Sequence, residues 1–349
     1  MGGLSVIAPP AGDTASRPHR RARRAFLVSN YLILGAASGC GFLTLSLRLV
    51  PSVDGFLLIL LHALTRVVVE GDGGRGDRRE PRHRARALAA RLAERGLTVV
   101  LTARDAARGE AAAAPLLERG LAVAVRRLDV ADAASVAEFA AWLRDDVGGL
   151  DILVNNAAVS FNEIDTNSVE HAETVLRTNF YGAKMLTEAL LPLFRQSPAT
   201  SRILNISSQL GLLNKLRDPS LRSLLLDEDR LTESAIEGMV ARFLSEVKDG
   251  TWSDPGRGWP KVWTDYAVSK LALNAYSRLL ARRLQARGQR VSVNCFCPGF
   301  TRTDMTKGWG KRTADEVADV GARLALLPPD ELPTGTFFRW CTPQLYSKL

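Results

Sequence analysis

The run Ile152-Leu153-Val154-Asn155-Asn156-Ala157-Ala158 changes from apolar to polar at one point, between Val154 and Asn155. It predicts a short buried strand that ends where the asparagines begin. Comparable apolar stretches lie at residues 97–102, 122–128, 202–206 and 291–297, with helical patterns between them at residues 87–96, 105–119, 135–147 and 169–194. Strands that alternate with helices of this length predict βαβ units. The predicted fold class is therefore α/β, a Rossmann-like, doubly wound parallel sheet in a single domain.

Residues directly after the predicted strands are the first place to look for a site, because ligands of such sheets bind beyond the carboxyl ends of the strands. Asp129-Val130 follows one strand, and the asparagine pair quoted above follows another. Asn205-Ile206-Ser207-Ser208 and Pro298-Gly299-Phe300-Thr301 end two more. These groups predict one ligand site along the carboxyl edge of the sheet.

Tyr266-Ala267-Val268-Ser269-Lys270 opens a further predicted helix. Residues four apart lie one above the other on a helix, so the Tyr266 phenol and the Lys270 ammonium share a face. A free phenol has a pKa of about 10. We expect the cation to lower that pKa into the range of a general acid-base. Taken alone, the same spacing is also typical of an ordinary exposed helix.

Together with Thr178-Asn179-Phe180-Tyr181-Gly182, these motifs occur in the order found in the short-chain dehydrogenase/reductase family. The chain resembles that family over about residues 87–349. Leu101-Thr102-Ala103-Arg104-Asp105 and the long segment between Ser208 and Tyr266 resemble the branch of carbonyl reductases and menthol dehydrogenases. The resemblance implies an oxidoreductase that transfers a hydride between NADP(H) and a carbonyl or secondary alcohol of a small, hydrophobic substrate. The alternative is mere similarity of fold.

The resemblance also implies catalytic roles. Tyr266 would give a proton to the carbonyl oxygen, and Lys270 would lower the pKa of Tyr266 and bind the nicotinamide ribose. Ser208 would hold the substrate oxygen, whereas Ser207 points away by strand alternation. Asn179 would hold a water that links Lys270 to solvent. A developing alkoxide needs one acid and one fixed donor, which Tyr266 and Ser208 would supply.

Arg104 decides which cofactor is expected. It follows a strand at the place where an acidic residue would bind the free ribose hydroxyls of NAD. Arginine suits a 2′-phosphate instead, so NADP(H) is expected; the alternative is a solvated loop charge. The resemblance places further cofactor contacts along the strand ends: Asp129 and Val130 at the adenine, Asn155 and Ala157 at the adenosine ribose, Pro298, Gly299, Thr301 and Thr303 at the nicotinamide amide, with Tyr266 and Lys270 at the nicotinamide ribose.

One part of the family pattern has no counterpart. The glycine-rich phosphate loop, T-G-x-x-x-G-x-G, is expected near residues 78–85 and is absent there. Gly71, Gly73 and Gly76 match a G-x-G-x-x-G spacing after Val67-Val68-Val69, which could form a strand. A phosphate loop leads straight into a helix, however, and here a charged segment with Pro81 follows. We interpret the match as accidental.

The genetic code offers a reason for the missing loop. Codons for residues 71–87, read one base later, can spell ATAVVVTGANRGIGHAL, which is a strand followed by the complete fingerprint. We therefore interpret the residues up to about Ala87 as the product of a misassembled reading frame. The alternative function is a non-catalytic Rossmann-fold protein, inactive because it lacks the loop, which the N-terminal segment could tether to a membrane.

Residues 213–262 carry apolar residues at helical spacing and predict a helical insertion before Tyr266. In the branch that the chain resembles, such a segment covers helices that otherwise form an oligomer interface, which implies a monomer. It would then also border the substrate mouth. A helical hairpin without substrate contact is the alternative.

The net charge of +9 is concentrated in the N-terminal part of the chain. Residues 1–95 carry 15 Arg and Lys against 7 Asp and Glu, whereas the remaining 254 residues carry 31 against 30. A nearly neutral body argues against a nucleic-acid partner. The four cysteines do not form a metal-ligand spacing, so no metal is expected, and a reduced intracellular protein is the simplest interpretation.

Residues 1–66 are interpreted as an N-terminal extension and residues 67–349 as the dehydrogenase domain. Residues 25–47 are uncharged and long enough to span a bilayer. The extension is therefore interpreted as a disordered segment, a membrane anchor or an artefact fused to a soluble enzyme. The C-terminal Ser347-Lys348-Leu349 matches the peroxisomal import tripeptide. The predicted location is the cytoplasm or the peroxisome, and the predicted partners are the small-molecule substrate and an import receptor.

Overall fold

A computed structural model of the chain describes residues 31–32, 45–51, 57–61, 66–70, 84–161, 166–195 and 201–344. The chain divides into two compact units, Met1–Leu64 and Thr65–Leu349. The first unit contains an antiparallel sheet in the order β1-β2-β3, formed by β1 (Tyr31–Leu32), β2 (Leu45–Pro51) and β3 (Leu57–Leu61).

The proposed membrane anchor at residues 25–47 lies for the most part outside the described residues. Where the structure is described within it, the backbone forms β1 and the start of β2. None of the described helices has the length and apolar character needed to cross a membrane.

The second unit is built on one sheet with the order β11-β10-β9-β8-β7-β4-β5-β6. Every neighbouring pair is parallel except β10 and β11. The doubly wound parallel sheet predicted from the alternation of strands and helices is confirmed. Its strands are β4 (Arg66–Glu70), β5 (Thr98–Ala103), β6 (Val123–Arg127), β7 (Ile152–Asn155), β8 (Ser201–Ile206), β9 (Val291–Cys297), β10 (Phe337–Arg339) and β11 (Thr342–Gln344).

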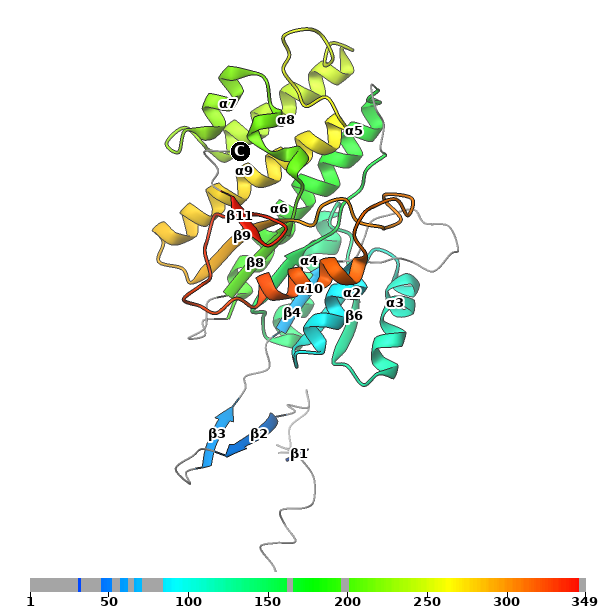
Figure 1. The fold of residues 1–349 in the computed structure, drawn as a ribbon, viewed down its shortest axis with the longest axis vertical. Helices are drawn as coiled ribbons and strands as arrows, with labels where there is room; N and C mark the ends of the chain where they lie inside the picture. Colours follow the sequence, from blue (N-terminus) through cyan, green and yellow to red (C-terminus); the bar gives the residue numbers. More distant parts are fainter. Residues whose placement is uncertain are drawn as a thin grey trace, which may run out of the picture. The chain divides into compact units, whose positions relative to one another are not determined.

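Helices cover both faces of this sheet (Figure 1). Successive strand residues point to opposite faces, so Val99 and Leu101 of β5 pack with α2, α3 and α10, and Val100 packs on the other side with α4, α5, α6 and α9. Burial on both faces explains why these strands are continuous apolar runs. The helices are α2 (Arg84–Ala93), α3 (Ala106–Glu118), α4 (Ala133–Trp142), α5 (Val169–Leu176), α6 (Ala183–Leu190), α9 (Thr264–Ala286) and α10 (Ala314–Ala325).

Strand β4 occupies the central place of the sheet, between β5 and β7. Val67-Val68-Val69 therefore does form a strand, and β4 takes the central position that the first strand of a doubly wound fold occupies. In the sequence, β4 lies farther before Arg104 than the spacing of the family motifs implies for that first strand. The glycines at 71, 73 and 76 and the charged segment after them lie outside the described residues. The description resumes at Arg84, where α2 begins.

The segment predicted as one long helix, residues 169–194, is interrupted. A π-helical turn, η2 (Arg177–Gly182), separates α5 from α6, and a short 3₁₀ turn, η3 (Leu191–Leu193), follows. Turns of this kind inside helices are frequent at functional sites. At Gly182 an added Cβ would lie 2.9 Å from the carbonyl oxygen of Val130, so glycine lets the turn approach the end of β6. A similar turn, η1 (Leu143–Val147), ends the helix predicted at residues 135–147.

The predicted helical insertion is present. It comprises η4 (Gln209–Gly211), η5 (Leu213–Lys215), α7 (Pro219–Leu226) and α8 (Glu233–Lys248). Asp218 and Thr232 cap the two helices through their side chains. α8 lies against α5 and α9 (Figure 1).

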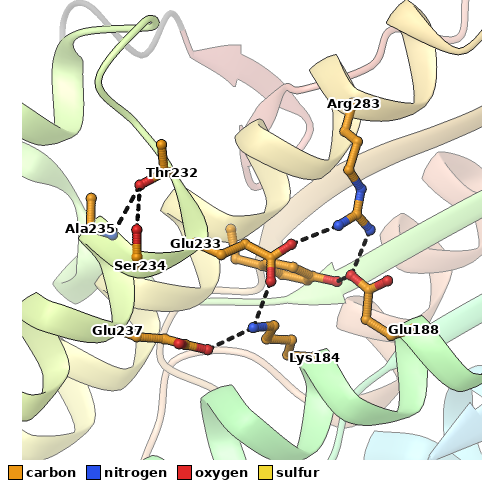
Figure 2. Close-up of polar contacts among 9 residues, drawn as sticks. Lys184, Glu188, Thr232, Glu233, Ser234, Ala235, Glu237 and Arg283 are labelled. Carbon is orange, nitrogen blue, oxygen red and sulfur yellow. Dashed lines mark hydrogen bonds and ion pairs between the residues drawn. The ribbon is translucent and has the colours of Figure 1, made fainter.

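Ion pairs fasten α8 to α6 and α9 (Figure 2). Lys184 Nζ of α6 lies 2.7 Å from Glu233 Oε2 and 2.6 Å from Glu237 Oε1 of α8. Arg283 of α9 then contacts Glu188 of α6 and Glu233 of α8, each at 2.6 Å. The insertion is thus held on the helical layer by charge as well as by apolar contact.

Candidate active site

A cavity of about 280 Å³ opens at the carboxyl ends of β8 and β9, where α9 begins. Residues of three predicted motifs, those that contain Ser208, Tyr266 and Pro298, line it, although 58 positions separate Ser208 from Tyr266 in the chain. Its lining residues are Arg84, Ser160, Ser207, Ser208, Gln209, Leu210, Trp263, Tyr266, Cys297, Pro298, Gly299, Phe300, Thr301, Thr303, Met305 and Thr306.

Ser208 and Tyr266 lie side by side in this cavity. The Leu210 backbone N–H donates to Ser208 Oγ at 3.2 Å, which orients the hydroxyl. Ser208 is hydrogen-bonded to the Tyr266 phenol. Ser207 donates its hydroxyl to Asn274 Oδ1 at 2.6 Å. The two serines therefore have different partners, and Ser208 is the one that meets the phenol.

The pKa of Tyr266 differs from the expectation. Burial raises the pKa of the phenol to about 12, while the charge of Arg84 and the hydrogen bond from Ser208 oppose that rise. Lys270 Nζ lies 5.7 Å from the centroid of the Tyr266 ring and donates to the carbonyl oxygen of Ile206 at 2.9 Å. The expectation that Lys270 brings this pKa down into the neutral range was wrong, because desolvation is the largest effect on the phenol and the cation that opposes it is Arg84.

Asn179 is fully buried in the π turn η2 and joins two parts of the site. Its amide group accepts from Val159 N at 2.8 Å and donates to Val159 O at 2.9 Å. It also donates to Ser269 Oγ, 3.1 Å away in α9. The side chain therefore fixes the segment after β7 against the helix that carries Tyr266 and Lys270. Its expected role at a water stays a prediction.

The segment after β9 supplies the other wall of the cavity. Gly299 has a φ of +76°, which turns the chain sharply after Pro298. Thr301 and Thr303 are buried, and Thr306 donates its hydroxyl to the carbonyl oxygen of Thr301 at 2.7 Å. Pro298, Gly299, Thr301 and Thr303, which were predicted to contact the nicotinamide amide, all line the cavity. Ser208 and Tyr266 line it as well.

The residues predicted for the adenosine half do not line the cavity. Arg104 is exposed at the end of β5, and Val130 is buried at the end of β6. Asp129 accepts from the backbone N–H of Ala131 at 3.0 Å. Ala157 is half-buried beyond the end of β7. They follow β5, β6 and β7, three parallel strands of one sheet.

The side chain of Asn155 has other partners than the predicted ribose. Its Nδ2 donates to Thr187 Oγ1 of α6 at 2.9 Å and to Asn205 Oδ1 of β8 at 2.6 Å. The residue is 4 % exposed. Asn155 therefore links two strands and a helix beneath the edge of the sheet.

Several cavity residues were missed from the sequence, among them Arg84 and Trp263. Arg84, the first residue of α2, lines the cavity and donates from Nε to Asn156 Oδ1 at 2.9 Å. Trp263 lines it from the position before α9. Neither belongs to a motif, and no pattern in the sequence shows that their side chains meet Tyr266. In the part of the chain that the structure describes, no group of His, Cys, Asp and Glu could hold a metal ion.

Sequence comparison identifies the class of protein that this fold and site define. Residues 85–217 and 251–327 match the short chain dehydrogenase family. The chain is 35% identical over 270 residues to (+)-neomenthol dehydrogenase of Arabidopsis thaliana, with 71% of this chain and 89% of that protein covered. It is 36% identical over 244 residues to carbonyl reductase (NADPH) 1 of Homo sapiens, with 68% and 85% covered.

Comparison with a solved structure supports the same family. The fold is similar to that of salutaridine reductase from Papaver somniferum, with a TM-score of 0.70, 32% identity and coverage of 78% of this chain and 99% of that one. The chain belongs to the short-chain dehydrogenase/reductase family.

Proposed function

We propose that the chain is an NADP(H)-dependent oxidoreductase that transfers a hydride between the cofactor and a carbonyl or secondary alcohol of a small hydrophobic substrate. The observation that carries the proposal is the meeting of the Tyr266 phenol and the Ser208 hydroxyl in one cavity, with the Lys270 ammonium behind the phenol. This is one proton donor and one oriented hydroxyl at the same point, as the reduction of a carbonyl requires.

The residues at the cavity fit the nicotinamide half of a dinucleotide. Hydroxyls of Thr301 and Thr303 and the backbone of the turn at Gly299 supply polar contacts for an amide, and Arg84 supplies a cation. Arg104, exposed at the end of β5, supports a 2′-phosphate and hence NADP(H). Asp129, Val130 and Ala157 would border the adenosine half. The name of the human relative includes NADPH, which supports the same choice.

When bound, NADPH supplies the hydride. Ser208 holds the carbonyl oxygen of the substrate: its own oxygen accepts the Leu210 N–H, and its O–H, which meets the Tyr266 phenol, turns to donate to that carbonyl oxygen. Tyr266 delivers a proton to that same oxygen as negative charge develops on it. The raised pKa keeps the phenol protonated at neutral pH, so it is an acid ready for reduction. Lys270 stabilises the phenolate that remains.

An apolar substrate is supported by the walls of the cavity. Leu210, Phe300 and Met305 line it. Phe300 is 46 % exposed, as is Val262 beside Trp263. Exposed apolar side chains beside a cavity favour a hydrophobic ligand. The name of the Arabidopsis relative, which includes neomenthol, supports such a class.

The alternative of a non-catalytic protein is not favoured, because the cavity holds the whole Tyr-Ser pair with the lysine behind it. We propose further that the domain begins at about residue 67, which the boundary of the second compact unit at Thr65 supports. A monomer is proposed because α8 covers α5 and α9 and is fixed there by Lys184 and Arg283 (Figure 2). Peroxisomal import through Ser347-Lys348-Leu349, which lies outside the described residues, completes the proposal.

The test is the consumption of NADPH by the purified chain with a panel of cyclic ketones, compared with NADH. We expect turnover with NADPH, and a loss of at least about a hundredfold in kcat for Tyr266→Phe. Tyr181→Phe is the matched control, because that phenol belongs to η2 and does not line the cavity. Equal activity of wild type and Tyr266→Phe would refute the assigned proton donor.

A further inference from the structure

The indole of Trp263 forms part of the wall of the cavity that holds Ser208 and Tyr266. Its Nε1 is buried and has no hydrogen-bond partner among the described residues. Leaving a buried donor unpaired is destabilising, and buried tryptophans usually find an acceptor. The same chain shows the usual case at Trp259, whose Nε1 donates to Glu246 Oε2 at 2.6 Å. Trp263 thus presents a donor that the protein itself does not satisfy.

The backbone at Trp263 is also unusual. Its φ of 47° and ψ of 60° lie in the left-handed region, which bulky residues rarely adopt. Such a conformation is strained and persists only when its surroundings enforce it. Here the Ala267 N–H donates to the Trp263 carbonyl oxygen at 2.7 Å, and Thr264 Oγ1 donates to Pro260 O at 2.8 Å. The contacts that begin α9 therefore hold Trp263 in a costly conformation next to the cavity.

Trp263 shares its wall of the cavity with Phe300. Their ring centroids are 6.2 Å apart and the planes are inclined by 36°. Phe300 contributes no polar group, so the indole N–H is the polar atom of this aromatic pair. An apolar ligand in contact with both rings would gain a hydrogen bond only if it offered an acceptor to Trp263.

We propose that Trp263 is a specificity-determining residue whose indole N–H donates to a second oxygen of the substrate, distinct from the carbonyl held by Ser208 and Tyr266. The substrate class is then an apolar ketone that carries an additional acceptor, such as an ether, ester or second carbonyl oxygen. This inference rests on the proposed function for the identity of the reacting carbonyl. The preference for the second oxygen rests on Trp263 alone.

The test measures ligand binding separately from turnover, so that the role of Trp263 and the proposed function are examined independently. Cyclohexanones that carry a methoxy group or an ethyl group at the same ring carbon differ by an oxygen in place of a methylene. One methoxy ketone and the matching ethyl ketone form a pair, and a pair is prepared for each position of the substituent on the ring. Binding of each ketone to the full chain is measured by ligand-observed NMR, with and without NADP⁺. The variants are Trp263→Phe, which keeps an aromatic ring but removes the N–H, and Trp309→Phe. Trp309 is 74 % exposed and does not line the cavity, so its variant is the matched control.

We expect wild type and Trp309→Phe to bind one methoxy ketone about five- to tenfold more tightly than its ethyl partner, the value of one hydrogen bond. Trp263→Phe should lose that preference and keep its affinity for the ethyl ketone, which also shows that the variant is folded. A wild type that binds both members of every pair equally, or a Trp263→Phe variant that keeps the preference, would overturn the inference. NADPH consumption is followed separately: binding with the preference but without turnover would sink the proposed function and leave the assignment of Trp263 standing.

Discussion

Gly211 shows how closely single residues set the geometry of the site. It ends η4, three residues after Ser208, where an added Cβ would lie 2.4 Å from the carbonyl carbon of Lys270 and 2.5 Å from Leu271 N. We expect Gly211→Ala to lower the free energy of unfolding by about 1–3 kcal/mol. Reduction should slow as well, since Ser208 and Lys270 are pushed apart. Urea unfolding and NADPH consumption measure the two effects.

Gly238 provides the control for that substitution. It lies within α8 with nothing within 4 Å of an added Cβ. Gly238→Ala should raise the free energy of unfolding by about 0.5–1 kcal/mol, because alanine is the better helix former. If both alanine variants changed stability alike, the close approach of η4 to α9 would have no energetic consequence.

The pKa of Tyr266 predicts opposite pH profiles for the two directions of the reaction. With the pKa raised to about 12, the phenol stays protonated across the neutral range. Ketone reduction needs this protonated form, so its rate should stay flat as the pH rises to about 10. Alcohol oxidation needs the phenolate and should rise about tenfold per pH unit over the same range. Initial rates in both directions test this.

Arg84 gives a second check on that pH profile. Its charge opposes the rise of the Tyr266 pKa, so Arg84→Met should raise the pKa further and move the oxidation profile to higher pH. A shift toward lower pH would contradict the electrostatic role of Arg84. Reduction at neutral pH should keep its flat profile, because the phenol is protonated in either case.

At the scale of elements, Glu246 fixes the insertion to the chain that leads into α9. Its side chain is 8 % exposed and accepts from Trp259 Nε1 at 2.6 Å, Arg242 Nε at 2.9 Å and Arg257 Nη1 at 3.3 Å. Arg242 extends the network to Asp218 at 2.8 Å, at the start of α7. One carboxylate thus joins α7, α8 and the segment before Tyr266.

Glu246→Gln should lower the free energy of unfolding by about 2 kcal/mol, because it leaves buried donors without their charged acceptor. This value allows for the partial exposure of Arg242, whose side chain is 37 % exposed. Glu118→Gln, at the exposed end of α3, should change stability by less than about 0.5 kcal/mol. The midpoints of thermal unfolding of the two variants test this prediction. Equal midpoints would mean that the Glu246 network contributes no more to stability than an exposed carboxylate does.

Most elements of the second unit were predictable because the strands β5, β7, β8 and β9 are buried along almost their whole length and are therefore apolar runs. β10 and β11 were not predicted, since strands of three residues carry too little pattern. The π turn at Asn179 was also missed, because it changes the path of a helix without changing its composition. These failures are local and leave the predicted fold class, a doubly wound parallel sheet, unchanged.

At the scale of the whole molecule, the sequence predicted six residues that line the cavity but not every side chain that reaches it. Ser208 and Tyr266 meet as expected, because the topology brings the strand ends to one edge. Asn155 instead bonds Thr187, 32 residues later, in a helix whose position follows from packing. Arg84 and Trp263 reach the cavity through contacts made by the complete fold. Such long-range placement has no periodic signal in the chain.

The start of α2 bears on the interpretation of the reading frame. In the alternative reading of residues 71–87, the fingerprint T-G-x-x-x-G-x-G would occupy residues 77–84. Its last glycine would then stand at Arg84, the residue where α2 begins. A glycine-rich turn that runs straight into a helix is what pyrophosphate binding requires, because the helix N-terminus presents its free N–H groups to the phosphates. The position of the helix is therefore the one that the restored fingerprint needs.

Replacing residues 71–87 by ATAVVVTGANRGIGHAL should therefore increase the affinity for NADPH by at least about tenfold, since even one added charge-assisted hydrogen bond contributes about 1.5–3 kcal/mol. NADPH fluorescence on titration with each chain measures the change. Changing Arg84 alone to Gly should not reproduce the gain, because one glycine does not form the turn. If the chain as written binds NADPH as tightly as the replaced chain, its own residues already hold the phosphates and the frame hypothesis is wrong. A transcript that encodes residues 71–87 continuously as written would lead to the same conclusion.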